Sequence, residues 1–335
     1  MSNTYFSLNT PLDMHIHFRE GDMLRNVAPL SAETFSGGVI MPNLVPPVDN
    51  LKRLNQYEQE IRDTLKGYVF EPFMTLFMKP YTEQELAQMK DRIIGIKLYP
   101  AGITTHSEDG INEIHEIAKT LELMQEMNIR LLVHGETNDF VMDREQAFIP
   151  IYEKLANHYP LLNIVMEHIT TRDTALLLDR YENLYATVTL QHLMITLDDV
   201  AGNLLNPHLF CKPIAKRPED RDSLLSLALE SHPKLAFGSD SAPHPIDAKE
   251  CSGCAAGVFT APIALQMLVE LFEENRALNQ LQKFVSDNAK QIYGVRPPEK
   301  TVVFEKCETV IPNQYGNVIP MFSGRNLKWR VKEIS

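Results

Sequence analysis

Eight short runs of apolar and β-branched residues recur along the chain, and the intervals between them are long enough for a helix. The runs are "LDMHIHF" (12–18), "GGVIMPNL" (37–44), "YVFEPFMTLFM" (68–78), "IIGIKLY" (93–99), "IRLLVHG" (129–135), "LNIVMEH" (162–168), "LYATVTLQ" (184–191) and "KLAFGSD" (234–240). Near-continuous apolar runs are typical of strands covered on both faces, as in a parallel sheet. This pattern restricts the chain to a few α/β folds.

The segments between the runs show the spacing of amphipathic helices. Residues 51–66 and 112–127 each place apolar side chains on one face, and Asn112 is suited to cap the second helix. Eight strands alternating with helices predict an α/β fold, a (β/α)8 TIM-type barrel, over residues 1–295. Residues 296–335, with the β-type runs "TVVF" and "LKWRVK", are expected to form a short C-terminal extension packed on the barrel. The stretch 192–233 is long for one connection, which favours a functional loop.

Composition excludes several classes of partner. A net charge of −12 argues against nucleic acid as the main partner. The chain contains no run of about 18 apolar residues, so no membrane span is expected. The start "MSNTYFSLNTP" lacks the features of a signal peptide. Cys251 and Cys254 form a C-x-x-C without a second pair, so reduced thiols are favoured over a zinc knuckle. A cytoplasmic location is the expectation.

Polar residues that could bind a metal close five of the apolar runs. His15 and His17 are two positions apart, so on a strand they face the same way. An H-x-H pair alone is a weak signal, because such pairs are often structural. Four further residues lie at or near the ends of other runs, where the strands of a barrel surround one site: Lys97, His134, His168 and Asp240. Six such residues at matching positions predict a common metal site.

The residue types suit two zinc ions. His15, His17 and Asp240 would hold one ion, and His134 and His168 the other. Two dications about 4 Å apart repel each other and need a negative bridge. Burial beside metals lowers the pKa of a lysine, and the neutral amine of Lys97 could then add carbon dioxide. The resulting carbamate, N6-carboxylysine, would offer one oxygen to each metal.

Seven motifs together resemble the class II dihydroorotases of pyrimidine biosynthesis, within the amidohydrolase superfamily. They are "DMHIHFREGDML", "VIMPNLVPPV", "IKLYPAGITT", "LLVHGE", "EHITT", "HLFCKPIAKR" and "GSDSAPH", and the similarity extends from about residue 12 to residue 294. Three features depart from the family pattern. Lysine stands at position 212 where leucine is familiar, and leucine stands at position 190 where proline is familiar. The stretch "CSGCAAGVF" has fewer cysteines than the corresponding stretch of some relatives.

The resemblance implies the reversible cyclisation of N-carbamoyl-L-aspartate to (S)-dihydroorotate in UMP synthesis. It implies two Zn²⁺ per subunit bridged by carboxylated Lys97, a small-molecule substrate and a homodimer. A bridging hydroxide would attack the ring carbonyl, with Asp240 as general acid and base. The resemblance also assigns substrate-binding and lid residues. The substrate set is Arg19, Asn43, His134, Lys212, His244 and Ala256, with the backbone at 212 and 256 as the expected contact, and the lid set is Thr104 and Thr105.

Two other functions stay open at this stage. One is another cyclic-amide hydrolase, such as an allantoinase or a hydantoinase. The other is a non-catalytic homologue that serves as a scaffold, although the presence of all six candidate ligands argues against it. The remaining histidines are expected to be structural, including His192, while the role of His208 is left undecided.

Overall fold

Eight parallel strands form one sheet in which every strand pairs with the next along the chain. The computed structural model describes residues 4–102, 110–111 and 114–335. The strands are β2 (Leu12–Ile16), β3 (Gly37–Ile40), β4 (Glu71–Phe77), β5 (Gly95–Leu98), β6 (Arg130–Val133), β7 (Ile164–Met166), β8 (Leu184–Val188) and β9 (Leu235–Phe237). A parallel bridge between Ile16 and Ser241 brings the first strand against the segment after the last. The sheet therefore curls into a barrel, as the sequence predicted.

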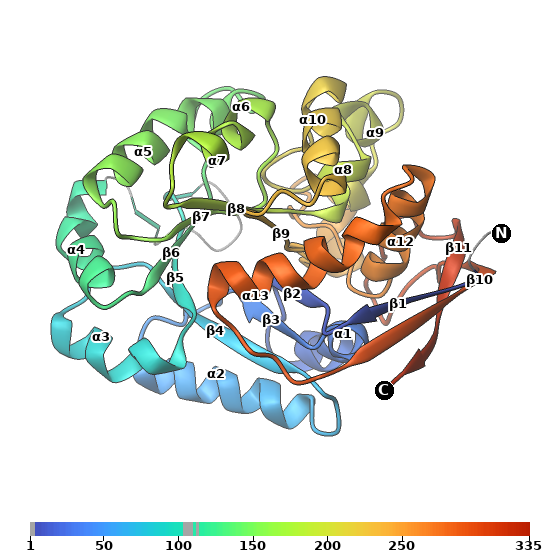
Figure 1. Cartoon of the computed structure of the whole chain (residues 1–335), viewed down its shortest axis with the longest axis horizontal. Helices are drawn as coiled ribbons and strands as arrows, with labels where there is room; N and C mark the ends of the chain where they lie inside the picture. The colour runs from blue at the N-terminus through green and yellow to red at the C-terminus, as the bar shows by residue number, and fades with distance from the viewer. Residues whose placement is uncertain (1–3, 103–109, 112–113) are drawn as a thin grey trace.

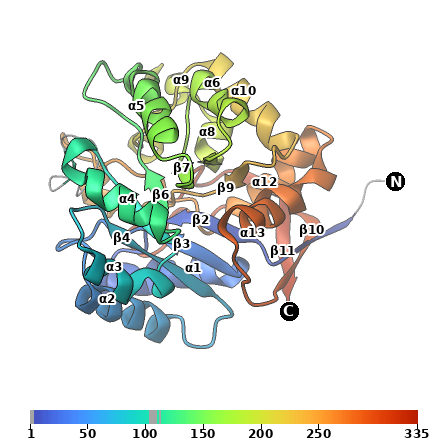
Figure 2. The ribbon, with the colours of Figure 1, turned by 60° about the vertical axis from the view of Figure 1, so that its left-hand side comes forward.

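Helices surround the strands (Figure 1), and a second view shows them outside the sheet as well (Figure 2). The α-helices are α1 (Gly21–Thr34), α2 (Leu51–Thr64), α3 (Glu83–Met89), α4 (Ala118–Glu126), α5 (Arg144–His158), α6 (Arg172–Ala175), α7 (Leu177–Arg180), α8 (Leu190–Met194), α9 (Leu197–Ala201), α10 (Pro218–Leu229), α11 (Ile246–Lys249), α12 (Ala264–Glu274) and α13 (Asn288–Tyr293). Shorter helices are η1 (Lys90–Arg92), η2 (Ile114–Ile117), η3 (Pro207–Leu209), η4 (Leu278–Gln280) and the π-helix η5 (Lys283–Asp287).

Helix α2 shows how local sequence produces these elements. The side chain of Asn50 accepts a hydrogen bond from the Arg53 amide at 3.0 Å, which satisfies an amide at the start of the helix. Leu54 and Ile61 are fully buried, as their spacing predicted. The second predicted helix is found as η2 followed by α4, while its expected cap, Asn112, lies outside the described residues.

The barrel interior holds a small apolar cluster below the strand ends. Its members come from alternate strand positions and from α13, and include Leu12, Met14, Val39, Leu132, Val165, Ala236 and Tyr293. A much larger cluster lies between the strands and the surrounding helices. The apolar interior supports the polar side chains that follow it at the C-terminal ends of the strands.

A separate antiparallel sheet contains the C-terminal residues. Strand β10 (Thr301–Val310) pairs with both β11 (Asn326–Ile334) and β1 (Tyr5–Asn9), and Leu8 and Trp329 are fully buried. In Figure 1 the three strands lie to one side of the barrel, near α12. The sequence pattern did not predict a strand at the position of β1. The division of the chain at residue 295 stays a prediction, although this sheet takes in residues from both sides of it.

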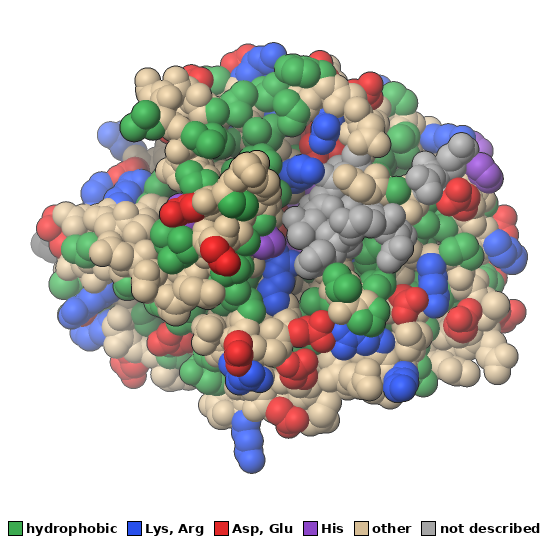
Figure 3. All heavy atoms as spheres, turned by 180° about the vertical axis from the view of Figure 1, so that it is seen from behind, with side chains coloured by type: hydrophobic (Ala, Val, Ile, Leu, Met, Phe, Trp, Pro, Cys, Tyr) green, Lys and Arg blue, Asp and Glu red, His purple; other side chains and the backbone are tan. Residues whose placement is uncertain are grey.

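The structure bears on two further predictions, one about the long 192–233 connection and one about membrane spans. The connection from β8 to β9 is not a plain loop, because it contains α8, α9, η3 and α10. Among the described residues, no helix combines the length and the apolar composition needed to cross a bilayer. On the face drawn in Figure 3, acidic and basic side chains are interspersed.

Candidate active site

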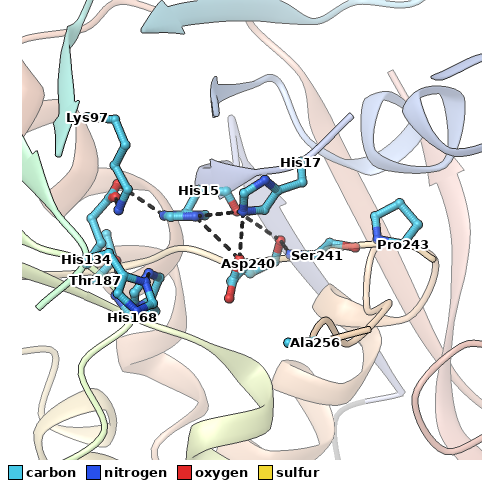
Figure 4. A network of polar contacts seen from close by, with 12 residues as sticks. His15, His17, Lys97, His134, His168, Thr187, Asp240, Ser241, Pro243 and Ala256 are labelled. Atoms are coloured by element: carbon cyan, nitrogen blue, oxygen red, sulfur yellow. Dashed lines mark hydrogen bonds and ion pairs between the residues drawn. The ribbon is translucent and has the colours of Figure 1, made fainter. Parts of the chain in front are cut away.

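The six predicted ligands come together at the C-terminal ends of the strands (Figure 4). His15 and Lys97 lie on β2 and β5, while His134, His168 and Asp240 lie one, two and three residues after the ends of β6, β7 and β9. All six side chains are buried, and Lys97 is fully so. Because parallel strands all end at the same rim of a barrel, residues more than two hundred positions apart share one site.

His15, His17 and Asp240 form one cluster. The Nε2 atoms of the two histidines are 3.2 Å apart, and Oδ1 of Asp240 lies 3.4 Å from the first and 3.1 Å from the second. Ligand atoms about 2.0–2.1 Å from a tetrahedral zinc ion are separated by about 3.3 Å. The three atoms therefore fit a shared cation, and the group is one of two such clusters found among the described residues.

The second histidine pair has similar geometry. Nδ1 of His134 lies 3.2 Å from Nε2 of His168. Burial holds the pKa of His168 well below its ordinary value and lowers that of His17 to about 4. These imidazoles are neutral at pH 7, which is the state that binds metal.

Backbone contacts hold Asp240 beside β2. The Asp240 amide donates to the His15 carbonyl at 2.9 Å. Asp13 Oδ1 accepts from the Ser239 amide at 2.7 Å. Burial opposes ionisation of Asp240, but the hydrogen bond from His17 and the nearby histidines outweigh it and lower its pKa to about 2. The carboxylate is therefore ionised and directed at both histidines of its cluster.

Lys97 has a partner that the sequence analysis missed. Its Nζ donates to Oε2 of Glu167, and Oε1 of the same carboxylate lies 3.1 Å from His15 Nδ1. Burial alone would raise the pKa of Glu167, but its interactions with His15 and Lys97 lower it to about 2. Burial lowers the pKa of Lys97. The signal in the sequence was a glutamate inside an otherwise apolar run, "LNIVMEH".

Glu136 is the second missed carboxylate. Its Oε2 lies 2.8 Å from His134 Nε2, on the opposite side of the ring from His168. It is 1% exposed, and burial opposes its ionisation. The hydrogen bond from His134, together with the nearby cations Lys216 and Arg144, outweighs burial and keeps the pKa of Glu136 below the ordinary value. The imidazole of His134 is thus held from outside by a carboxylate, an arrangement common in metal sites.

Three site residues have backbone conformations that are rare for side chains other than glycine. The φ angles are +62° at Arg19, +44° at His168 and +46° at Asp240. Such left-handed conformations cost about 1–3 kcal/mol each and persist where surrounding structure enforces them. Here each one lies just after a strand end and turns the chain at the rim of the barrel.

The predicted substrate residues line a cavity beside the histidines. Its wall includes Arg19, Asn43, Lys212 and Ala256, together with Tyr99 and Gly257. Nε of Arg19 donates to the Pro243 carbonyl at 3.3 Å, and its Nη2 lies 3.1 Å from His244 Nε2. The same His244 atom is 3.0 Å from the Ala256 carbonyl. The structure thus brings four residues of the predicted substrate set to one cavity, with His244 in contact with two of them, whereas His134 is not part of this lining.

The remaining predictions have mixed outcomes. Thr104 and Thr105, the predicted lid tip, lie outside the described residues. His192 is structural, because its ring bonds Thr189 Oγ1 at 2.9 Å and the Pro213 carbonyl at 3.0 Å. His208, left undecided, pairs with Glu250 at 2.9 Å. All four cysteines are free thiols.

Comparison with known proteins gives a consistent result. No family model matches the chain. A dihydroorotase from Helicobacter hepaticus is 44% identical over 97% of both chains. Among solved structures, dihydroorotase from Campylobacter jejuni is 53% identical with a TM-score of 0.95 and covers 99% of both chains. Dihydroorotase from Saccharomyces cerevisiae, in complex with 5-fluoroorotic acid, is 34% identical with a TM-score of 0.92 over 98% of this chain and 99% of that one. Given identity of this level over nearly the full length, the chain belongs to the dihydroorotase family.

Proposed function

We propose that this protein interconverts N-carbamoyl-L-aspartate and (S)-dihydroorotate, with release or consumption of water, in pyrimidine synthesis. The supporting observation is a buried cluster of His15, His17 and the ionised Asp240, with the pair of His134 and His168 nearby, beside a cavity lined by Arg19. A carboxylate substrate suits the planar fork of arginine. The relative from yeast was solved with 5-fluoroorotic acid.

The metal content is part of the proposal. We infer two zinc ions, one held by His15, His17 and Asp240 and the other by His134 and His168, with carboxylated Lys97 between them. Two zinc ions in such a site would polarise the substrate carbonyl and supply an activated water at neutral pH. The spacing of the nitrogen and oxygen atoms in the two groups of side chains supports the binding of two zinc ions.

The pairing of Lys97 with Glu167 bears on how the site is loaded. Without metals, the ammonium of Lys97 is matched by this buried carboxylate. Carboxylation replaces the positive charge by a negative one, next to Glu167, and only nearby cations would make that arrangement stable. We therefore propose that carboxylation of Lys97 and metal binding occur together.

The protein's own side chains provide proton transfer and orientation. In the hydrolytic direction Asp240 takes the proton released as water adds to the ring carbonyl, and passes it to the departing ring nitrogen. In the biosynthetic direction the same carboxylate accepts the nitrogen proton. Arg19 and Asn43, with the backbone at 212 and 256, are proposed to hold the substrate carboxylate.

The test combines metal analysis with an assay. Metal-free protein would be reloaded with zinc, with and without bicarbonate, and tested on dihydroorotate, hydantoin and allantoin. We expect two zinc ions per chain, turnover of dihydroorotate alone, and a requirement for bicarbonate. Lys97→Ala should lose both activity and metal. Turnover confined to hydantoin or allantoin would refute dihydroorotate as the substrate. Full zinc loading without turnover of any of the three compounds would favour a non-catalytic scaffold.

Assembly and location complete the proposal. A homodimer is proposed from family membership, and light scattering of the purified protein would test it. A cytoplasmic location is proposed because all four cysteines are free thiols, as expected in a reducing compartment.

A further inference from the structure

A buried lysine outside the metal clusters makes three hydrogen bonds, all to backbone carbonyls. Lys249, the last residue of α11, is 3% exposed. Its Nζ donates to the carbonyls of Phe210 at 3.0 Å, Ala255 at 2.7 Å and Gly257 at 2.8 Å. An ammonium group has three N–H donors, so this arrangement uses the full donor capacity of the side chain.

The three carbonyls belong to two segments that form the substrate side of the cavity. Ala255 and Gly257 flank Ala256, and Phe210 is two residues before Lys212. Ala256, Gly257 and Lys212 all line the cavity beside the histidines. The segments come from different connections of the barrel, one after β8 and one after β9. Their direct link is a hydrogen bond from the Gly257 amide to the Phe210 carbonyl at 2.9 Å, the same carbonyl that Lys249 binds.

The 255–257 segment is also linked through His244 to Arg19, the residue proposed to bind the substrate carboxylate. The Ala256 carbonyl lies 3.0 Å from His244 Nε2, which is 3.1 Å from Arg19 Nη2. A displacement of residues 255–257 would therefore move the support of Arg19 as well as one wall of the cavity.

We propose that Lys249 is a positioning residue for substrate binding, which holds the 210–212 and 255–257 segments at the separation that the substrate carboxylate requires. This inference rests on the proposed function of these segments. Lys249 touches none of the expected metal ligands and does not line the cavity itself, although it binds the carbonyl of Gly257, which does. It would therefore act on affinity for substrate more than on the chemical step. Burying a charge is costly unless its donors are satisfied, and here all three donors of Lys249 bind carbonyls of the two segments.

The charge state of Lys249 supplies an independent check. Burial lowers its pKa to about 8. The titratable groups around it are the thiols of Cys254 and Cys211 and the imidazole of His244, while the adjacent Glu250 is paired with His208. Above this pKa a neutral amine has two N–H donors for three carbonyls, so one contact is lost. We expect the KM of the wild-type enzyme to rise as the pH passes through about 8.

The decisive experiment compares two buried lysines. Lys300 also donates to three carbonyls, those of Ala32, Glu33 and Phe35, but at the end of α1, away from the cavity. Lys249→Met should raise KM for dihydroorotate about tenfold or more with a smaller change in kcat, since unpaired carbonyls release the segments. Lys300→Met should leave KM unchanged, and both variants should retain wild-type zinc content.

A second readout separates this inference from the proposed function. Hydrogen exchange of the Gly257 amide should be about tenfold faster in Lys249→Met than in wild type or Lys300→Met, whatever the substrate. A folded Lys249→Met variant with KM within twofold of wild type, or with unchanged exchange at Gly257, would overturn the inference. If that variant does not fold, a wild-type KM that stays constant from pH 7 to 9.5 would overturn it. Absence of dihydroorotate turnover in wild type would refute the proposed function, and the exchange measurement would still decide the role of Lys249.

Discussion

Two histidines of the site present different ring nitrogens to the centre, and a buried carboxylate lies behind each. Glu167 faces Nδ1 of His15, so Nε2 points to His17 and Asp240. Glu136 faces Nε2 of His134, so Nδ1 points to His168. A carboxylate on the outer nitrogen fixes the proton there and leaves the inner lone pair for a cation. We therefore expect both glutamates to set metal affinity without binding metal themselves.

This expectation is testable at Glu136. Glu136→Gln keeps the size of the side chain but weakens its hold on the His134 proton, so zinc affinity should fall about 10–100-fold. Competition with a chelator would measure it. The matched control is Asp179→Asn, because Asp179 pairs with His232 on the surface at 3.2 Å. Equal zinc affinities in Glu136→Gln and the control would contradict the orienting role.

Asp240 is expected to transfer protons as well as to bind metal. Asp240→Asn keeps an oxygen near His15 and His17 but removes the base, so kcat should fall about a hundredfold or more in both directions. Steady-state assays with dihydroorotate and with N-carbamoyl-L-aspartate would measure this. Asp247→Asn, an exposed aspartate on α11, serves as the control. A variant that loses activity in one direction alone is incompatible with a single acid–base residue.

The sequence predicted the six candidate ligands but not the two glutamates that hold them. Five apolar runs contain or end in the predicted ligands, and six such residues at matching positions indicated a common site. Glu167 and Glu136 adjoin predicted histidines, and their pairing depends on ring orientation, which spacing along the chain does not encode. The strand before Arg19 ends at Ile16 and Arg19 has a positive φ, a local geometry that the residue pattern does not encode.

At the scale of elements, the eight barrel strands were predictable because each is a separate apolar run buried on both faces. Strand β1 was not, because its partner β10 lies almost three hundred residues away and "YFSLN" has no matching signal nearby. The helices of the 192–233 connection were missed for another reason. Helices α8 and α9 have five residues each, too few to show a helical period.

Strand β1 should contribute to stability without affecting the site. Leu8 is fully buried and belongs to the larger apolar cluster, and its backbone position is opposite Val302 of β10. Leu8→Ala should lower the free energy of unfolding by about 2–5 kcal/mol, through lost burial and a residual cavity. Ser7→Ala, at an exposed position on the same strand, should change it little. Urea unfolding would compare them, and zinc content and KM should match wild type in both. A Leu8→Ala protein with unchanged stability would show that β1 is not held by its buried face.

For the whole molecule, the barrel explains why one short chain can hold so many unfavourable groups. Eight strands deliver buried histidines, carboxylates and a lysine to one rim, and the two apolar clusters supply the stability that tolerates them. Burial in particular lowers the pKa of His17, His168 and His192 and so keeps these three side chains neutral at pH 7. This links the electrostatics of the site to the stability of the entire fold.

Stability of the metal-free protein should therefore depend on pH in a definite direction. Burial lowers the pKa of His17 and His192 to about 4 and that of His244 to about 3, from 6.5 in the unfolded chain. Between these values the unfolded state binds protons that the folded state does not, so stability is present above pH 6.5 and is lost as the pH falls toward 4. Each such histidine contributes a slope of about 1.4 kcal/mol per pH unit. Urea unfolding of chelator-treated protein from pH 7.5 to 4.5 would measure the sum. His192→Gln removes one of these groups, at a position outside the predicted ligand set. It should reduce the slope by about 1.4 kcal/mol per pH unit, the contribution of one proton, whereas replacement of the surface residue His158 should not change the slope. Zinc should move the loss of stability to lower pH in wild type, because bound histidines resist protonation further. A pH-independent free energy of unfolding in the metal-free protein would show that these imidazoles are not buried in the neutral form.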